Sequence, residues 1–229
     1  MKIAILGTGI VGRTLANGFS QAGHDVLMGT RDVTETLARK EGDAMGNPPF
    51  PEWQREHPEI QLATFAEAAS TGEVVINATS GTGSLDALAA AGSALENKVL
   101  VDVANPLDFS HGMPPTLSVA NTDSLAEQIQ QRFQGAKVVK ALNTMNARLM
   151  INPSSLSEDH DVFLAGDDDA AKETVRHLLH ELGWKDGNIV DVGGIQAARG
   201  LEMYLPLWLN LMGKLGTPDF NIKIVKATS

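Results

Sequence analysis

The sequence contains no cysteine, and this absence excludes several functions at once. It rules out disulfide bridges, thiolate nucleophiles and thiolate metal ligands, and it is compatible with the reducing cytosol. No apolar stretch approaches the about 18 residues of a membrane-spanning helix, and the chain opens on a strand-like segment instead of a secretory signal. We therefore expect a soluble, cytoplasmic protein without a membrane partner.

Positive charge is also scarce. The chain has 18 Lys and Arg residues against 28 Asp and Glu residues, a net charge of −10, and no basic run is longer than two residues. Such a balance argues against a nucleic-acid partner. With 229 residues and 43% hydrophobic content, the chain can bury the core of one large domain or of one domain plus a small appendage.

The most informative pattern lies at the start of the chain. Residues 2–6 form a short apolar run typical of a buried parallel strand, and G-x-G-x-x-G follows at Gly7, Gly9 and Gly12. An amphipathic helix and a second strand, residues 25–28, come next. In this layout the glycines allow a tight turn, close approach of a pyrophosphate, and close packing of the helix on the sheet. The pattern predicts a dinucleotide-binding turn.

The end of the second strand indicates which dinucleotide binds. NAD sites usually carry an acid there, whereas this chain has Gly29, Thr30 and Arg31. A guanidinium can pair with the 2′-phosphate and a threonine hydroxyl can donate to it, so the pattern favours NADP. Asp32 comes one residue later, where it either repels the phosphate or caps a helix expected over 34–41. The alternative reading of Arg31 is a solvated surface charge.

Further strands predict the fold class. Apolar runs separated by helix-like segments predict strands at 60–65, 73–77, 98–102 and 136–140. This alternation is typical of an α/β Rossmann fold, a doubly wound parallel sheet. We expect the NADP-binding Rossmann domain over residues 1–150 and a small C-terminal α/β domain over 151–229, which completes the cleft for a second substrate.

Polar residues follow three of the strands, at the edge of the sheet where ligands bind in this fold class. Turn chemistry alone is the alternative explanation, because Asn, Thr, Ser and Pro are common turn residues. The predicted cofactor-binding residues are Gly7, Thr8, Gly9, Ile10, Val11, Gly12, Thr30, Arg31, Ala78, Thr79, Ser80, Ala104, Asn105, Pro106 and Asn143.

Two long loops are expected beside this site. Residues 42–58 contain four prolines, and we favour a cover over the cofactor, with an insertion packed elsewhere as the alternative. Residues 103–122 border the site and contain His111, which is either a proton carrier or, as is more common, a solvated side chain.

The C-terminal part predicts a strand at 161–165, a helix at 168–182, a strand at 188–192 and a long helix at 195–215 that Pro206 kinks. Residues 221–225 could add a final strand. The apolar face of the long helix indicates a core contact or a homodimer contact, and Tyr204, the single tyrosine, could face the cleft. Weak catalytic candidates are therefore Asn143, Tyr204 and His111.

No metal site is predicted. His177 and His180 lie beside Glu181 on the expected helix, but no third ligand has an obvious place. The acidic run 167–169 is explained by helix capping and the helix dipole.

Several segments resemble one known family over nearly the whole chain. These segments are similar to the coenzyme F420-dependent NADP oxidoreductases: GTGIVGRTLANGF with GHDVLMGTRD, then VVKALNTMNA, AGDDDAAKETV and DVGGIQAARGLEMYLPLWLNL. The chain is also similar to the cytosolic reductase domain of the six-transmembrane metalloreductases, which shares the V-V-K-A-x-N segment. The resemblance implies a Rossmann domain with a small C-terminal domain, NADP held at Thr8, Thr30 and Arg31, and a second redox partner over the nicotinamide. The chain departs from the archaeal reductases at Asn143 and Glu35.

Three functions fit these observations. The first is hydride transfer between NADP(H) and a deazaflavin (F420) or flavin, which needs mainly stacking and distance. The second is reduction of a small carbonyl or imine, which needs a proton donor such as Tyr204 or His111. The third is an NADP-binding sensor without turnover.

Overall fold

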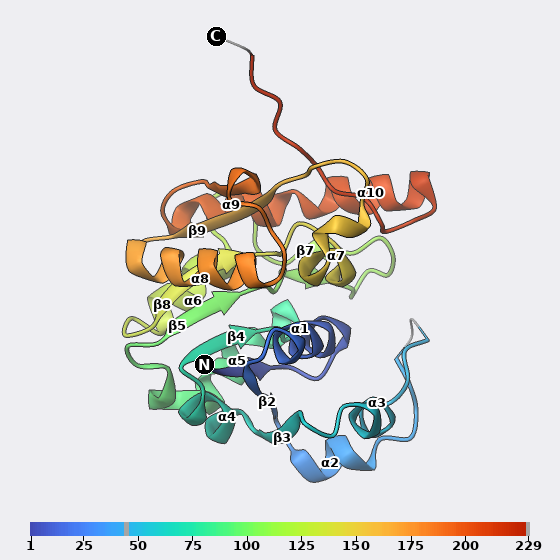
Figure 1. The fold of residues 1–229 in the computed structure, drawn as a ribbon, viewed down its shortest axis with the longest axis vertical. Coiled ribbons are helices and arrows are strands. Elements are labelled where there is room, and N and C mark those ends of the chain that lie inside the picture. Colours follow the sequence, from blue (N-terminus) through green and yellow to red (C-terminus); the bar gives the residue numbers. More distant parts are fainter. Residues whose placement is uncertain (44–45, 228–229) are drawn as a thin grey trace.

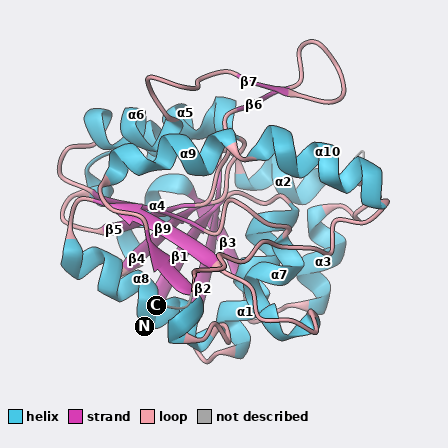
Figure 2. Ribbon diagram, turned by 90° about the horizontal axis from the view of Figure 1, so that it is seen from above, coloured by secondary structure: helices cyan, strands magenta, loops and turns pink. Residues whose placement is uncertain are grey.

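The computed structural model describes residues 1–43 and 46–227, which fold around one eight-stranded sheet (Figure 1). The strand order is β10-β9-β8-β5-β4-β1-β2-β3, and the short strands β6 and β7 form a separate ribbon that projects from the body (Figure 2). The strands are β1 (Lys2–Leu6), β2 (Asp25–Thr30), β3 (Gln61–Thr64), β4 (Val74–Asn77), β5 (Val99–Asp102), β6 (Leu107–Asp108), β7 (Thr116–Leu117), β8 (Lys137–Ala141), β9 (Val162–Gly166) and β10 (Ile189–Asp191).

Helices cover both faces of the sheet. They are α1 (Ile10–Gln21), α2 (Val33–Ala38), α3 (Phe50–Glu56), α4 (Phe65–Thr71), α5 (Ser84–Ala91), α6 (Leu125–Arg132), α7 (Ala147–Ile151), α8 (Asp169–Glu181), α9 (Ala198–Met203) and α10 (Leu205–Leu215). Single 3-10 turns are η1 (Gly81–Gly83), η2 (Gly92–Leu95), η3 (Pro153–Ser155), η4 (Asp186–Asn188) and η5 (Ile195–Ala197). A strand with helices on both faces is buried on both, which is why the central strands are continuous apolar runs.

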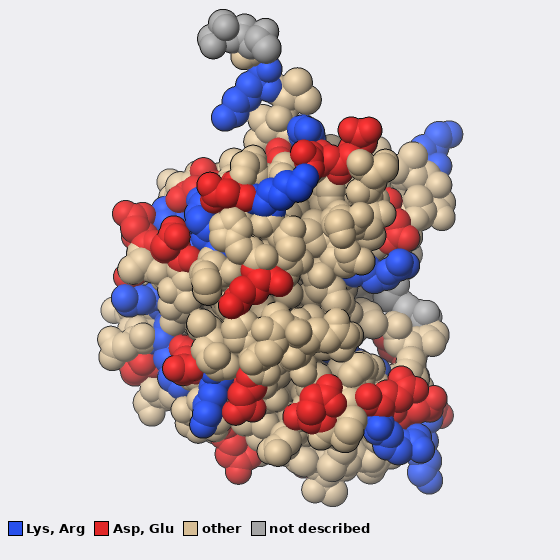
Figure 3. Space-filling model, in the orientation of Figure 1, with Lys and Arg blue, Asp and Glu red and all other residues tan. Residues whose placement is uncertain are grey.

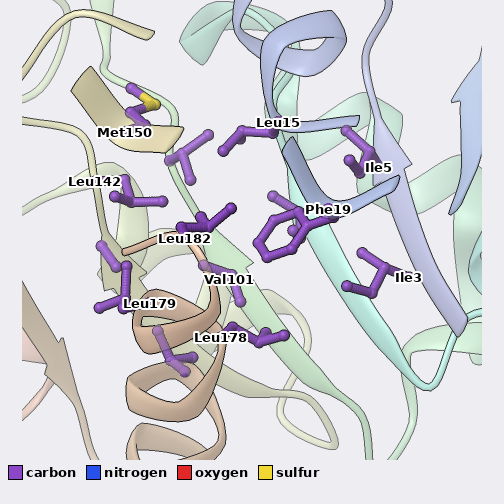
Figure 4. Close-up of a cluster of buried hydrophobic side chains, with 14 of the residues drawn as sticks. Ile3, Ile5, Leu15, Phe19, Val101, Leu142, Met150, Leu178, Leu179 and Leu182 are labelled. Carbon is purple, nitrogen blue, oxygen red and sulfur yellow. The ribbon is translucent and has the colours of Figure 1, made fainter. Parts of the chain in front are cut away.

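Two hydrophobic clusters fill the space between the sheet and the helices. Side chains alternate along β1, so Ile3 and Ile5 join one cluster while Ala4 and Leu6 join the other. The first cluster, drawn in Figure 4, packs Phe19 of α1 with side chains of α7 and α8. The second packs the opposite face under α4, α5 and α6. Each fully buried Val, Leu, Ile, Met or Phe side chain of these clusters stabilises the fold by about 2 kcal/mol.

The sheet is parallel except at one junction. β1 pairs in parallel with β2 and β4, and β5 in parallel with β4 and β8, whereas β9 runs antiparallel to β8. The connection between β8 and β9 contains α7, a helix of 5 residues that packs against α1. The Rossmann expectation is confirmed, with the correction that β9 reverses direction.

The domain boundary near residue 150 stays a prediction. β9 and β10 of the C-terminal part continue the same hydrogen-bonded sheet, and the chain then crosses back over the α6 face through η5 and α9. This return carries residues of α9 to the carboxyl ends of the central strands.

Three expectations need correction. The segment 42–58 is not a plain loop: it contains α3, which begins at Phe50 beside Pro49 and Pro51, and residues 44–45 lie outside the described residues. The long C-terminal helix is divided into η5, α9 and α10, with the break at Tyr204. Residues 221–225 form no strand; the Ile222 carbonyl instead accepts from the Asp161 N–H at 2.9 Å.

Charge is spread over the surface. Acidic and basic side chains are interspersed on the face shown in Figure 3, with acidic groups in excess as the composition requires. Among the described residues, no helix has both the length and the apolar character needed to cross a bilayer.

Candidate active site

The glycine turn between β1 and α1 has three positions with different demands. Gly7 has φ +121°, and a Cβ there would lie 2.4 Å from the Ala78 carbonyl oxygen; a Cβ on Gly12 would lie 2.2 Å from the Gly7 oxygen. Both positions therefore require glycine for the fold itself. A Cβ on Gly9 would meet nothing within 4 Å. The middle position thus leaves open space in front of the backbone, where a phosphate fits.

The start of α1 is available to an anion. Gly9 is the N-cap residue, and no side chain caps this helix of 12 residues. Its first N–H groups and the positive end of the helix dipole are therefore directed at the space beside the turn. This arrangement fits the pyrophosphate of a dinucleotide.

At the end of β2, the Arg31 side chain has no ion-pair partner among the residues that the structure describes. Arg31 is exposed, whereas the Thr30 hydroxyl is buried and lies 2.8 Å from the Thr36 hydroxyl of α2. Asp32 caps α2 by accepting from the Glu35 N–H at 2.8 Å, so the capping alternative is confirmed. The Asp32 carboxylate is engaged by the helix terminus, which leaves Arg31 as the group best placed for a 2′-phosphate.

A cavity of about 270 Å³ opens next to the glycine turn. Its wall is made by the turns that follow β4 and β5. A Cβ on Gly81 would lie 1.9 Å from the Asn105 oxygen, so these two turns are in direct contact. Eleven residues line the cavity: Val11, Ala78, Thr79, Ser80, Gly81, Thr82, Val103, Ala104, Asn105, Leu107 and Phe109. The wall includes six of the predicted cofactor-binding residues, and the long loop contributes Leu107 and Phe109.

Behind this wall, a chain of hydrogen bonds fixes the two turns. The Thr79 hydroxyl donates to the Asn77 side-chain oxygen at 2.7 Å, and the Asn77 amide donates to Asp102 at 2.8 Å. Asn77 and Asp102 are both fully buried. Because buried polar groups are costly when unpaired, this network holds the cavity wall in one conformation.

The network ends on a buried ion cluster that the sequence reading missed. The Lys140 ammonium of β8 lies 2.8 Å from a carboxylate oxygen of Asp102 and 2.8 Å from one of Glu202, and it also donates to the Ala104 carbonyl. All three ionisable side chains are at most 1% exposed. Lys140 thus joins the turn after β5 to α9.

The two buried carboxylates of this cluster are stabilised by backbone N–H groups as well as by the lysine. Burial alone would lower the pKa of Lys140, but the two carboxylates beside it raise that pKa, so the ammonium stays protonated. Burial raises the pKa of Glu202, and the carboxylate also accepts from the Leu125 and Ala126 N–H groups at 2.8 and 3.1 Å. Glu202 therefore anchors α9 to the first turn of α6.

Asn143 lies at the base of the cavity wall and pairs with Asn105. Its amide donates to the Asn105 side-chain oxygen at 2.8 Å and to the Leu201 carbonyl at 3.1 Å, while the Asn105 amide donates to the Asn143 carbonyl. These partners fix the orientation of both amides. The Asn143 side-chain oxygen is left without a partner among the described residues, although the residue is only 2% exposed.

The other catalytic candidates lie outside the cavity lining. His111 is exposed in the projecting loop. Tyr204 lies at the junction of α9 and α10; burial raises its pKa, and its hydroxyl has no partner within the described part of the chain. No three His, Asp or Glu side chains of residues 1–43 and 46–227 are grouped to hold one metal ion.

Comparisons with known proteins agree with this geometry. A family model described as NADP oxidoreductase, coenzyme F420-dependent, matches residues 2–106. The F420-dependent NADP reductase of Methanothermobacter marburgensis is 30% identical over 231 residues, covering 98% of both chains. The Metalloreductase STEAP3 of Rattus norvegicus is 27% identical over 90% of this chain and 38% of its own length.

Solved structures point the same way. A crystal structure named as a candidate F420-dependent NADP reductase, from Arthrobacter sp. FB24, is 55% identical, with a TM-score of 0.93 over 99% of this chain and all of that one. The glycine turn, the sheet and the full-length similarity together assign the chain to the coenzyme F420-dependent NADP oxidoreductase family.

Proposed function

We propose that this NADP-dependent oxidoreductase transfers a hydride between NADP(H) and a deazaflavin of the F420 type. The observation that carries the proposal is the cavity lining: none of its eleven residues has an ionisable side chain. Hydride transfer between two flat rings needs orientation, contact and exclusion of water, but no acid or base on the protein. The curated relative in Methanothermobacter marburgensis is named for the same pair of substrates.

Different residues of the chain would bind different parts of NADP. Gly9 and the uncapped start of α1 suit the pyrophosphate, and the exposed Arg31 suits the 2′-phosphate. The wall formed by residues 78–82 and 103–105 would orient the nicotinamide end. Its position is fixed from behind by Asn77, Asp102 and Lys140.

The test of this proposal is an anaerobic acceptor panel. Purified protein is mixed with NADPH or NADH and with oxidised F420, FMN, or a set of carbonyl and imine compounds. We expect rapid, NADPH-specific reduction of F420. Binding of NADPH with reduction of none of these acceptors would contradict the proposal and favour a sensor without turnover.

The assignment of the 2′-phosphate to Arg31 has its own test. Arg31→Ala should lower the preference for NADPH over NADH by about tenfold or more, since a charge-assisted hydrogen bond is lost. Arg148→Ala, which removes another exposed arginine and its long ion pair with Asp219 at 3.5 Å, is the matched control. An unchanged NADPH to NADH ratio in Arg31→Ala would refute this placement.

A second candidate function, reduction of a small carbonyl or imine, is favoured by one observation. The Tyr204 hydroxyl has no hydrogen-bond partner among the residues that the structure describes, and burial raises its pKa, so it stays protonated and can donate. Tyr204→Phe separates the two reactions: a carbonyl or imine reductase should lose most of its rate, whereas hydride transfer to a deazaflavin should keep it.

We also propose that the protein is cytoplasmic and forms a homodimer. α10 exposes Leu207 and Leu215, each more than half accessible, and such side chains suit a contact with a second copy. Analytical ultracentrifugation of the protein and of a Leu207→Glu variant tests the dimer, which the charged side chain should dissociate.

A further inference from the structure

Arg13, the residue after the third glycine, connects two segments that are far apart in the sequence. Its Nε donates to the Thr8 carbonyl at 2.8 Å, and its Nη1 donates to the Pro48 carbonyl at 2.6 Å. The guanidinium also lies 5.5 Å from the centre of the Phe50 ring. Only 9% of the residue is exposed. One buried cation therefore joins the glycine turn to residues 46–57.

Residues 46–57, which include α3, are themselves firmly attached. Phe50 is fully buried and belongs to the same cluster as Leu15 of α1. Trp53 packs on this cluster, with its ring 5.5 Å from Phe50 and 4.5 Å from His57. The segment is therefore part of the folded body next to the glycine turn, and Arg13 is the polar contact between the two.

The contact with Thr8 controls the direction of a backbone donor. The peptide between Thr8 and Gly9 is planar, so the Gly9 N–H points opposite to the Thr8 carbonyl. When Arg13 holds that carbonyl, the Gly9 N–H is held on the side away from the guanidinium. Arg13 thereby fixes the direction of one backbone donor of the turn.

Burying the Arg13 guanidinium costs free energy, so we ask what its contacts offset. Burial lowers the pKa of Arg13, which means that removal from water disfavours the charged form of the side chain. An apolar side chain would fill the volume without this cost, but it would leave the carbonyls of Thr8 and Pro48 without their donor. The cation also adds positive potential beside the turn that receives phosphate.

We propose that Arg13 is a positioning residue that couples the phosphate-binding turn to residues 46–57, which makes this segment a wall of the NADP site at its pyrophosphate and adenosine end. The inference rests on the proposed placement of NADP at the glycine turn. It gives the 46–57 segment a role in cofactor binding and assigns Arg13 no direct contact with the reacting atoms.

The test measures two nucleotides with two variants. Arg13→Lys keeps the charge but lacks the planar guanidinium, whose Nε and Nη1 donate in two fixed directions, and Arg13→Met removes the charge. Both should weaken NADPH binding, by about tenfold or more for Arg13→Met, and raise KM for NADPH with little change in kcat. The KM for reduced nicotinamide mononucleotide, which lacks the pyrophosphate and adenosine, should not change. A general loss of structure would affect both nucleotides.

Two further variants serve as a control and as an independent test of the segment. Arg132→Met removes the other arginine that lies over a phenylalanine, at 5.8 Å from Phe133 on α6, and should leave NADPH binding unchanged. Asn47→Ala removes the hydrogen bond from the Asn47 side-chain amide to Asp43, 2.7 Å, but neither of the two Arg13 hydrogen bonds, and should weaken NADPH binding to a smaller extent. This variant tests the segment even if the Arg13 variants fail to fold.

Trp53 supplies a direct signal from the segment. NADPH should change the Trp53 emission of the wild type, and Trp53→Phe should remove that change. If the wild type does not bind NADPH, the proposed function fails. If the wild type binds and Arg13→Lys, Arg13→Met and Asn47→Ala all bind NADPH with the wild-type constant, this inference alone is overturned.

Discussion

The two ends of the candidate site are built in different ways. At the end proposed for the pyrophosphate, the groups that would meet the ligand are backbone atoms of six consecutive positions, Gly7 to Gly12, together with empty space beside Gly9. At the other end, side chains of β5, β8 and α9 meet in the Asp102, Lys140 and Glu202 cluster. The first end depends on local geometry and the second on long-range packing. Substitutions should therefore lower NADPH affinity at the first end and stability at the second.

The largest expected effect is at the ion cluster. Lys140→Met leaves the Asp102 and Glu202 carboxylates buried without their cation and should lower the free energy of unfolding by about 3–5 kcal/mol. Lys137→Met, on the same strand, removes only the exposed pair with Asp168 and should cost less than about 1 kcal/mol. Urea unfolding measures both, and equal losses would contradict the role assigned to the cluster.

The glycine turn should separate affinity from stability. Gly9→Ala has room for its methyl group and should fold with wild-type stability, but the methyl group occupies the space intended for phosphate, so NADPH affinity should fall by about a hundredfold. Gly12→Ala collides with the Gly7 carbonyl and should instead destabilise the protein itself. Tight NADPH binding by Gly9→Ala would exclude the proposed phosphate position.

A smaller effect is expected where α9 meets α6. Arg199 donates to both carboxylate oxygens of Glu127, at 2.8 and 2.6 Å, and this bonding lowers the pKa of Glu127 below its ordinary value of 4.5. A lowered carboxyl pKa stabilises the fold above the unfolded pKa, and this contribution is lost as the pH falls through the folded one. Arg199→Met should therefore destabilise the fold at pH 7, and this loss should shrink as the pH drops below 4.5.

The control for this prediction is Arg176→Met, whose carboxylate partners Glu173 and Asp186 are exposed, so solvent screens both pairs. It should change the unfolding free energy little at any pH. A cost of Arg199→Met that is the same at pH 7 and at pH 3 would mean that the ion pair with Glu127 contributes no pH dependence.

The sequence predicted the phosphate end because that end is local. The glycine spacing, the apolar run of β1 and the capping position of Asp32 each act within a few residues. The predicted strands other than 221–225 are confirmed, and so is the family resemblance. The helix α3 was missed because its prolines suggested a loop, although proline near a helix N-terminus favours the start of a helix. The site residues themselves stay predictions.

The ion cluster was missed for a physical reason. Lys140 stands in the apolar run VVKA, where a single lysine in a buried strand is a sign of a paired charge. Its partners, Asp102 and Glu202, come from β5 and α9, and only the antiparallel turn to β9 and the return over α6 bring α9 to them. Nothing in the local pattern specifies that route.

The central claim is direct hydride transfer across one cavity. It is tested best by anaerobic single turnovers with NADPH deuterated at either face of the reacting nicotinamide carbon and with oxidised F420, followed by mass analysis of the reduced deazaflavin. The account predicts that deuterium moves from one of the two forms only, with none from the other. Reduction of F420 without deuterium from either form, or NADPH binding without reduction, would contradict it.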